Sequence, residues 1–140
     1  MTLTISETRD IALCRHLRRV VFIDEQGVSE ADELDDQDDT AIHLLAQVDG
    51  DPIGTARLLI QGDTGKIGRV CVLVLMRHQG IGAALIRAAI DRLTGEPGVA
   101  LAKLGAQTHA IGFYESLGFA AFGPVYDDAG IAHRDMALTL

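Results

Sequence analysis

The stretch from Val70 to Leu85 passes without a break from an apolar, β-branched run through two glycines into helical periodicity. A strand, a tight turn and a helix are therefore expected to follow one another directly. Backbone N–H groups at such a junction point to one place, and the helix dipole adds positive potential there. Gly80 and Gly82 have no side chains, so the backbone N–H groups there are accessible to a ligand. We interpret the segment as a phosphate-binding loop between a strand and a helix.

Two common nucleotide-binding motifs do not fit this loop. A Walker loop requires Lys followed by Ser or Thr after its last glycine, whereas Gly82 is followed by Ala83 and Ala84. A dinucleotide fingerprint requires a third small residue where this chain has Leu85. The pattern that remains is Arg-x-x-Gly-x-Gly, which occupies residues 77–82 and is called the glycine loop below.

Length and composition exclude several classes of protein. A chain of 140 residues can bury one core, so a single domain is expected. It has no apolar run long enough to cross a bilayer and no basic, hydrophobic leader, which predicts a cytoplasmic protein without a membrane partner. A net charge of −8 argues against a nucleic-acid partner. Cys14 and Cys71 lack metal-ligand spacing, so free thiols and no metal are expected.

Hydrophobic periodicity predicts a mixed α/β chain. A short strand at Leu3–Ile5 precedes a helix from Thr8 to Glu25, which ends before Gly27. An antiparallel meander of three strands is predicted next, at 43–48, 53–60 and 66–72. A helix from Gly82 to Gly95 then leads to a strand at 99–104, which would lie parallel to strand 66–72. A helix around 110–117 and two strands within 119–140 complete the chain.

The segment from Glu30 to Asp39 carries seven carboxylates in ten residues and little that could enter a core. We expect a solvated loop. An alternative is that part of this segment attracts an amine or a cationic peptide towards the active centre. Calcium binding is not expected, because the order of ligands found in an EF-hand is absent.

Two motifs resemble those of the Gcn5-related N-acetyltransferases (GNAT). The glycine loop is similar to motif A of that family, and Ala110-x-x-Phe113-Tyr114 followed by Leu117-Gly118-Phe119 is similar to motif B. Residues at both ends resemble the small ElaA-like branch: Val21, Phe22, Glu25, Gln26, Gly130, Ile131, His133 and Met136. The resemblance implies one N-acetyltransferase domain over 1–140, with the α/β (α+β) GNAT fold: a single central mixed sheet with an antiparallel N-terminal meander, parallel cofactor-cleft strands and about four flanking helices.

The resemblance also implies that acetyl-coenzyme A is the co-substrate and that no metal is needed. Its pantetheine arm would bond to the strand backbone, and its pyrophosphate would sit in the glycine loop. The implied cofactor-binding residues are Cys71, Val72, Arg77, His78, Gln79, Gly80, Ile81, Gly82, Ala83, Gln107 and Tyr114. The chain departs from the family at Val74-Leu75-Met76, where a Pro-acidic-aromatic sequence is common, and at Gln107, where asparagine is common.

The implied reaction is direct attack of a primary amine on the thioester in a ternary complex, with the Val72 N–H as oxyanion donor. Tyr114 is the expected general acid for the departing thiolate. Strand 66–72 contains no carboxylate, so the base is sought among His133, Glu25 and His43. We favour His133, because the ordinary pKa of histidine, near 6.5, lets it accept a proton at neutral pH. Cys71 as a transient acetyl carrier is an alternative.

Two function classes stay open on these residues. The first is an acetyl-coenzyme A-dependent amine N-acetyltransferase, an acyltransferase acting on a small-molecule or peptide amine. The second is a non-catalytic acyl-coenzyme A sensor that signals to a partner. The presence of Tyr114 favours the enzyme. Many relatives form dimers, so a homodimer is possible in either case.

Overall fold

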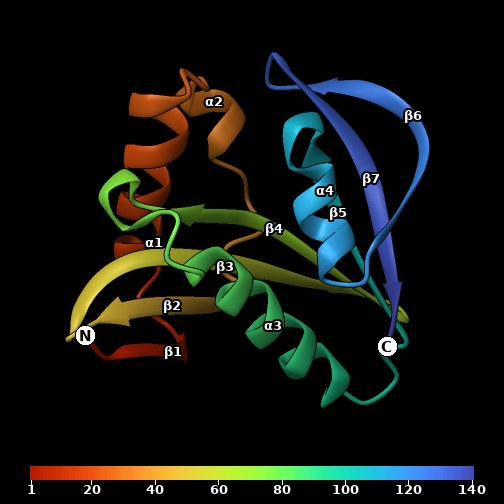
Figure 1. The fold of residues 1–140 in the computed structure, drawn as a ribbon, viewed down its shortest axis with the longest axis horizontal. Helices are drawn as coiled ribbons and strands as arrows, with labels where there is room; N and C mark the ends of the chain where they lie inside the picture. Colours follow the sequence, from red (N-terminus) through yellow and green to blue (C-terminus); the bar gives the residue numbers. More distant parts are fainter.

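The computed structural model describes residues 1–140 and contains one seven-stranded sheet of order β1-β2-β3-β4-β5-β7-β6 (Figure 1). All neighbours are antiparallel except β4 and β5, which run parallel. The predicted meander, the parallel crossover and the two C-terminal strands are confirmed. The strands are β1 (Leu3–Thr8), β2 (Ile42–Val48), β3 (Asp51–Gln61), β4 (Thr64–Val72), β5 (Leu101–Gln107), β6 (Ala120–Asp128) and β7 (Ile131–Thr139).

Four α-helices flank the sheet, with one π-helix and two 3₁₀ turns between them. None of the helices combines the length and apolar composition that crossing a bilayer would require. The helical segments are α1 (Ile11–Arg18), the π-helix Arg19–Glu25, α2 (Glu30–Glu33), the 3₁₀ turn Val74–Met76, α3 (Ile81–Thr94), the 3₁₀ turn Thr108–Ala110 and α4 (Ile111–Ser116).

The helices cover both faces of the sheet, and the core is divided accordingly. Leu44 packs in the large cluster that contains the apolar face of α3, whereas the next residue, Leu45, packs with Leu17 and Val21. Successive side chains of a strand point to opposite faces. Helix α1 therefore lies on the face opposite α3, and α4 joins the α3 side because Tyr114 packs against the large cluster (Figure 1).

One predicted boundary is wrong, and another is confirmed. The N-terminal helix begins at Ile11 instead of Thr8, because the Asp10 carboxylate accepts the Leu13 N–H at 3.1 Å and caps it there. The strand predicted at 66–72 does end at Val72, although the apolar run continues to Met76. The partner strand β3 begins at Asp51 and offers little further ladder, so the chain leaves the sheet in a 3₁₀ turn where Leu75 is 88% exposed.

The prediction of a solvated acidic loop at Glu30–Asp39 is correct for most of the segment but wrong for two carboxylates, which α2 and the residues after it return to the interior. Glu33 and Asp38 are 3% and 1% exposed, and both bond to the guanidinium of Arg18, which is fully buried. Arg18 Nε donates to Glu33 Oε1 at 2.6 Å, and its terminal nitrogens donate to both Asp38 oxygens at 2.9 Å. Buried charges persist only when they are paired and hydrogen-bonded in this way.

Arginines also reach this segment from the sheet. Arg57 on β3 donates to both oxygens of Asp35, at 2.8 and 2.9 Å, and to Asp38 at 3.1 Å. Burial alone would raise the pKa of Asp38, but the bonds from Arg18, Arg15 and Arg57 outweigh it and hold the pKa far below its ordinary value. The acidic segment is thus a structural counter-charge for arginines beneath it.

Replacing Arg18 by Met is expected to lower the free energy of unfolding by about 3–5 kcal/mol, because it removes the only hydrogen-bond donor to the buried Glu33 carboxylate and two of the bonds to Asp38. The matched control is Arg19→Met, whose exposed pair with Glu30 at 3.5 Å is expected to contribute less than about 1 kcal/mol. Urea titration at neutral pH measures both. Equal losses in the two variants would contradict the assignment.

Candidate active site

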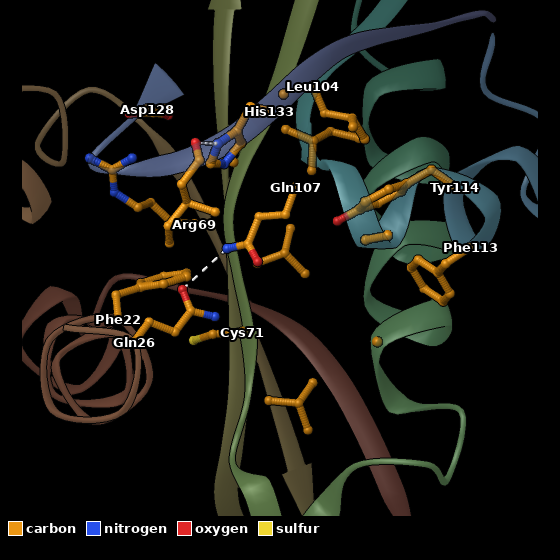
Figure 2. A pocket seen from close by; sticks show the side chains of 18 of the residues that line it. Phe22, Gln26, Arg69, Cys71, Leu104, Gln107, Phe113, Tyr114, Asp128 and His133 are labelled. Atoms are coloured by element: carbon orange, nitrogen blue, oxygen red, sulfur yellow. Dashed lines mark hydrogen bonds between the residues drawn. The ribbon is translucent and has the colours of Figure 1, made fainter. Parts of the chain in front are cut away.

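A cavity of about 600 Å³ opens where β4 and β5 separate (Figure 2). The two strands pair only between Thr64–Lys66 and Leu101–Lys103. Beyond these residues β5 continues along β7, while the facing edge of β4 borders the cavity. The N-terminus of α3, helix α4, the end of the π-helix and the β6–β7 hairpin complete its walls.

A β-bulge explains why the strands separate. Between Thr55 and Arg57, β3 advances two residues while β4 advances three, from Gly68 to Cys71. The additional residue on β4 goes with a left-handed backbone at Arg69, whose φ is +51°. A bulge of this kind bends its strand and increases the local twist. The bend turns β4 away from β5 at the point where the cavity begins.

The backbone of Val72 faces the cavity. Leu73 N–H donates to Ile53 O at 2.9 Å, so residues 53 and 73 form a hydrogen-bonded pair. Hydrogen-bonded and non-bonded pairs alternate along an antiparallel ladder. The adjacent pair, Gly54 with Val72, is therefore non-bonded, and the Val72 amide points to the other edge of β4. Arg77 Nε donates a hydrogen bond to the Val72 carbonyl oxygen at 2.9 Å, and the Val72 N–H has no acceptor within the chain.

The glycine loop presents bare amides at the start of α3. Gly80 adopts the left-handed conformation, with φ +79°, and α3 begins at the next residue. The N–H groups of Ile81, Gly82 and Ala83 donate to no acceptor within the chain, as is usual for the first turn of a helix. His78 and Gly80 to Ala83 line the cavity, whereas Gln79 does not. This geometry suits an anion.

Arg77 and Glu25 bond to each other. Arg77 lines the cavity, but its guanidinium donates to Glu25 at 2.6 Å and thereby ties the end of the π-helix to the glycine loop. The bond from Arg77 lowers the pKa of Glu25, which makes this carboxylate a weaker base. Glu25 does not line the cavity.

Tyr114 projects from α4 into the cavity, with its hydroxyl directed towards Gln107 (Figure 2). Its ring packs edge to face against Phe113 and Phe119, with centroids 5.0 and 6.1 Å away. These contacts hold the ring in one orientation. Burial raises the pKa of Tyr114, so the hydroxyl keeps its proton at neutral pH.

His133 lines the opposite side of the cavity, at the start of β7 (Figure 2). Its Nδ1 lies 2.7 Å from the carbonyl oxygen of Ile131. A carbonyl only accepts hydrogen bonds, so Nδ1 carries the proton of the neutral ring. Nε2 is then the acceptor nitrogen, and it has no partner within the chain. This is the state required of a general base.

The other histidine considered as a base, His43, lies outside the cavity. It is 3% exposed on β2, and its Nε2 lies 2.8 Å from the Asp38 carbonyl oxygen. This contact fixes the end of the acidic segment against the sheet. The structure therefore brings Tyr114 and His133 together around the cavity and leaves His43 and Glu25 out of it.

Two further predicted residues contribute to the cavity wall. The Cys71 side chain lines it, and burial raises the pKa of the thiol to about 12, so little nucleophilic thiolate exists at neutral pH. Gln107 donates from Nε2 to Gln26 Oε1 at 3.2 Å, across the cavity (Figure 2). Its Oε1 lies 2.7 Å from Nε2 of His109.

Sequence reasoning missed Tyr126. Its ring stacks on His133 at 6.0 Å with an interplanar angle of 23°, and its hydroxyl donates to Asp135 at 2.7 Å. The hydroxyl rests on Gly105 of β5, where an added Cβ would lie only 2.5 Å from it. A glycine inside a strand often marks such a close approach, but the predicted strand ended at residue 104, one residue before Gly105, so this signal was not used.

Known proteins match this chain along nearly its whole length. A model of the acetyltransferase (GNAT) domain matches residues 21–140. A Bacillus subtilis (strain 168) protein named as an acetyltransferase is 37% identical over 132 residues, which span 92% of this chain and 89% of that protein. Protein ElaA of Escherichia coli (strain K12) is 33% identical over 125 residues, spanning 86% of this chain and 82% of that protein.

Solved structures match it as well. The crystal structure of Escherichia coli ElaA has a TM-score of 0.86 at 26% identity, and covers 98% of this chain and 99% of that one. A GNAT family acetyltransferase from Elizabethkingia anophelis, solved with acetyl-CoA bound, has a TM-score of 0.74 at 18% identity, over 99% and 98% of the two chains.

The ring of His133 is expected to be the Nδ1-protonated tautomer whenever it is neutral, because the Ile131 carbonyl can only accept. Long-range ¹H–¹⁵N correlation spectra of the histidine rings distinguish the two tautomers. His133→Ala identifies the resonance. A neutral ring protonated on Nε2 would exclude the arrangement described here.

Proposed function

The chain belongs to the GNAT acetyltransferase family, and we propose that it transfers the acetyl group of acetyl-coenzyme A to a primary amine by direct attack in a ternary complex. The observation that carries the proposal is the cavity between β4 and β5. It joins the free amides of the glycine loop to Tyr114 and His133. A thioester laid along it would meet both a proton donor and a proton acceptor.

The residues present fit the cofactor. Three unpaired N–H groups at the start of α3 suit a pyrophosphate, as does the helix dipole behind them. The free Val72 N–H suits the thioester carbonyl at the end of an extended arm that runs between the two strands. Acetyl-coenzyme A supplies the activated acetyl group, and the chain supplies its orientation. Arg77 acts mainly through Glu25 in this scheme, as a brace for the loop.

His133 is the proposed base. An aliphatic amine is mostly protonated at neutral pH, since its ordinary pKa is about 10.4. Nε2 of His133 would accept that proton directly or through a water, and the Ile131 carbonyl would hold the imidazolium by its Nδ1–H. A neutral amine could then attack the thioester carbon. The Val72 N–H would stabilise negative charge as it develops on the carbonyl oxygen.

Tyr114 is the proposed acid. Its raised pKa keeps the proton on the hydroxyl until the sulfur of coenzyme A departs as a thiolate. No covalent acyl-enzyme is required in this scheme, and the high pKa of Cys71 argues against one.

A panel of primary amines incubated with the protein and acetyl-coenzyme A is expected to release free thiol faster than the protein does without an amine. Coenzyme A binding is measured in parallel by calorimetry. Binding without turnover on any amine would replace the enzyme by the alternative, a non-catalytic acyl-coenzyme A sensor. Absence of binding would reject both.

Tyr114→Phe is expected to lower kcat by about 10²-fold, because it removes the proton donor for the leaving thiolate while keeping the packed ring. Coenzyme A affinity should change little. The matched control is Tyr126→Phe, which deletes the other tyrosine hydroxyl of the chain but leaves the ring on His133. If Tyr114→Phe keeps the kcat of the unaltered protein, another group protonates the thiolate.

A further inference from the structure

A second cavity, of about 150 Å³, adjoins the first on the side of the acidic segment. The two cavities share Lys66, Gly68 and Arg69 on β4, so the bulged part of the strand forms the boundary between them. Arg57 and Asp35 line the smaller cavity but not the larger one. Since the larger cavity is the proposed site of acetyl transfer, the smaller one is a side chamber of that site.

Positive charge is in excess around the side chamber. Lys66, Arg69 and Arg57 line it, whereas Asp35 is its only lining carboxylate. Glu33 and Asp38 lie nearby and are shared with Arg18: Arg57 also donates to Asp38 at 3.1 Å, and Arg69 Nε lies 3.6 Å from Glu33. Lys66 has no such carboxylate partner. This imbalance is notable in a chain whose net charge is −8.

Two donor atoms beside the side chamber lack a hydrogen bond. Arg57 is 5% exposed, and its Nε has no hydrogen-bond partner although its terminal nitrogens bind Asp35 and Asp38. Nε of Arg69 is likewise buried without a hydrogen bond and lies 3.6 Å from Glu33 Oε1. The Lys66 ammonium forms no ion pair within 4.0 Å. Burial and the neighbouring charge of Arg57 lower the pKa of Arg69. The unpaired Lys66 ammonium is the accessible cation of the chamber, and it offers a carboxylate a charge-assisted hydrogen bond.

The larger cavity carries the opposite charge near its histidine. Asp128, on the hairpin that carries His133, lines it and forms no ion pair (Figure 2). Asp32, at the other wall, is also a lining residue without a partner. An approaching ammonium group is therefore attracted towards the proposed base, while an anion is attracted past Lys66 into the side chamber.

We propose that the amine acceptor of this protein also carries a carboxylate, which Lys66, Arg69 and Arg57 bind in the side chamber while the amine faces His133. The acceptor class is thus a small amino acid instead of a simple amine or polyamine. This inference rests on the proposed acetyl transfer. Lys66 and Arg69 are specificity-determining residues in this arrangement, because they bind a part of the substrate that does not react.

The test compares acceptors that differ only at the carboxylate. Glycine, β-alanine and γ-aminobutyrate are each paired with the corresponding carboxamide, and kcat/KM is measured from thiol release. For at least one pair, the carboxylate is expected to be preferred by about tenfold or more, the magnitude of a charge-assisted hydrogen bond. Lys66→Met should reduce that preference about fivefold or more, mainly through KM, since only binding of the non-reacting end is lost.

Lys103→Met is the matched control. Lys103 is the only other lysine of the chain and lies opposite Lys66 on β5, but it lines neither cavity and rests over Phe122. Removing its charge should leave the preference unchanged. Arg69→Met provides a second variant, with coenzyme A binding by calorimetry as the check that it is folded.

Three outcomes are decisive. A carboxylate preference that Lys66→Met or Arg69→Met reduces and Lys103→Met does not supports the inference. Turnover of carboxamides as fast as carboxylates at every chain length overturns it and leaves acetyl transfer intact, as does a preference that neither cavity variant changes. Thiol release from no amine at all rejects acetyl transfer itself, and the inference with it.

Discussion

The separation of β4 from β5 is the constraint on which the rest of the site depends. Two parallel strands would ordinarily satisfy each other's backbone, and here they do so over only three residue pairs. The bulge at Arg69 then turns β4 aside. An edge of unpaired backbone results, and the Val72 amide is part of it. The glycine loop follows at the end of the same strand, so one local irregularity sets the distance between the free amides of that loop and the proposed acid and base.

Much of the fold could be predicted from the sequence because it is encoded by local periodicity. Short-range signals include the alternation of apolar residues within β2 to β4, the apolar face of α3, and the glycines at turns and helix ends. The acidic segment could not be predicted in this way. Two of its carboxylates are buried against Arg18 and Arg57, which are distant in the sequence, and composition alone describes such a segment as hydrated. Long-range charge pairing leaves no periodic signal.

The candidate site likewise contains residues that local motifs predict and residues that only long-range contacts place. Tyr114, His133 and most of the glycine loop belong to contiguous motifs, and the structure gathers them around one cavity. Arg69 and Tyr126 belong to no motif. Their positions depend on the bulge and on the approach of one strand's side chain to a glycine of another. Glu25 and His43 were reasonable bases by residue type, but ion pairing and burial assign them to the framework.

The π-helix at Arg19–Glu25 has a consequence for how this architecture can diversify. A π-helical turn accommodates one residue more than an α-helical turn, so it is equivalent to a single insertion within a helix. The additional residue sets the direction in which Phe22 and Gln26 point from the helix axis at the cavity wall. Helix α1, which precedes it, keeps its packing on the sheet. Gain or loss of one codon in this segment would rotate the helical residues that line the cavity by about 100° per residue, the angular step of a helix. The chain can thereby exchange the side chains that face a substrate without redesigning the core.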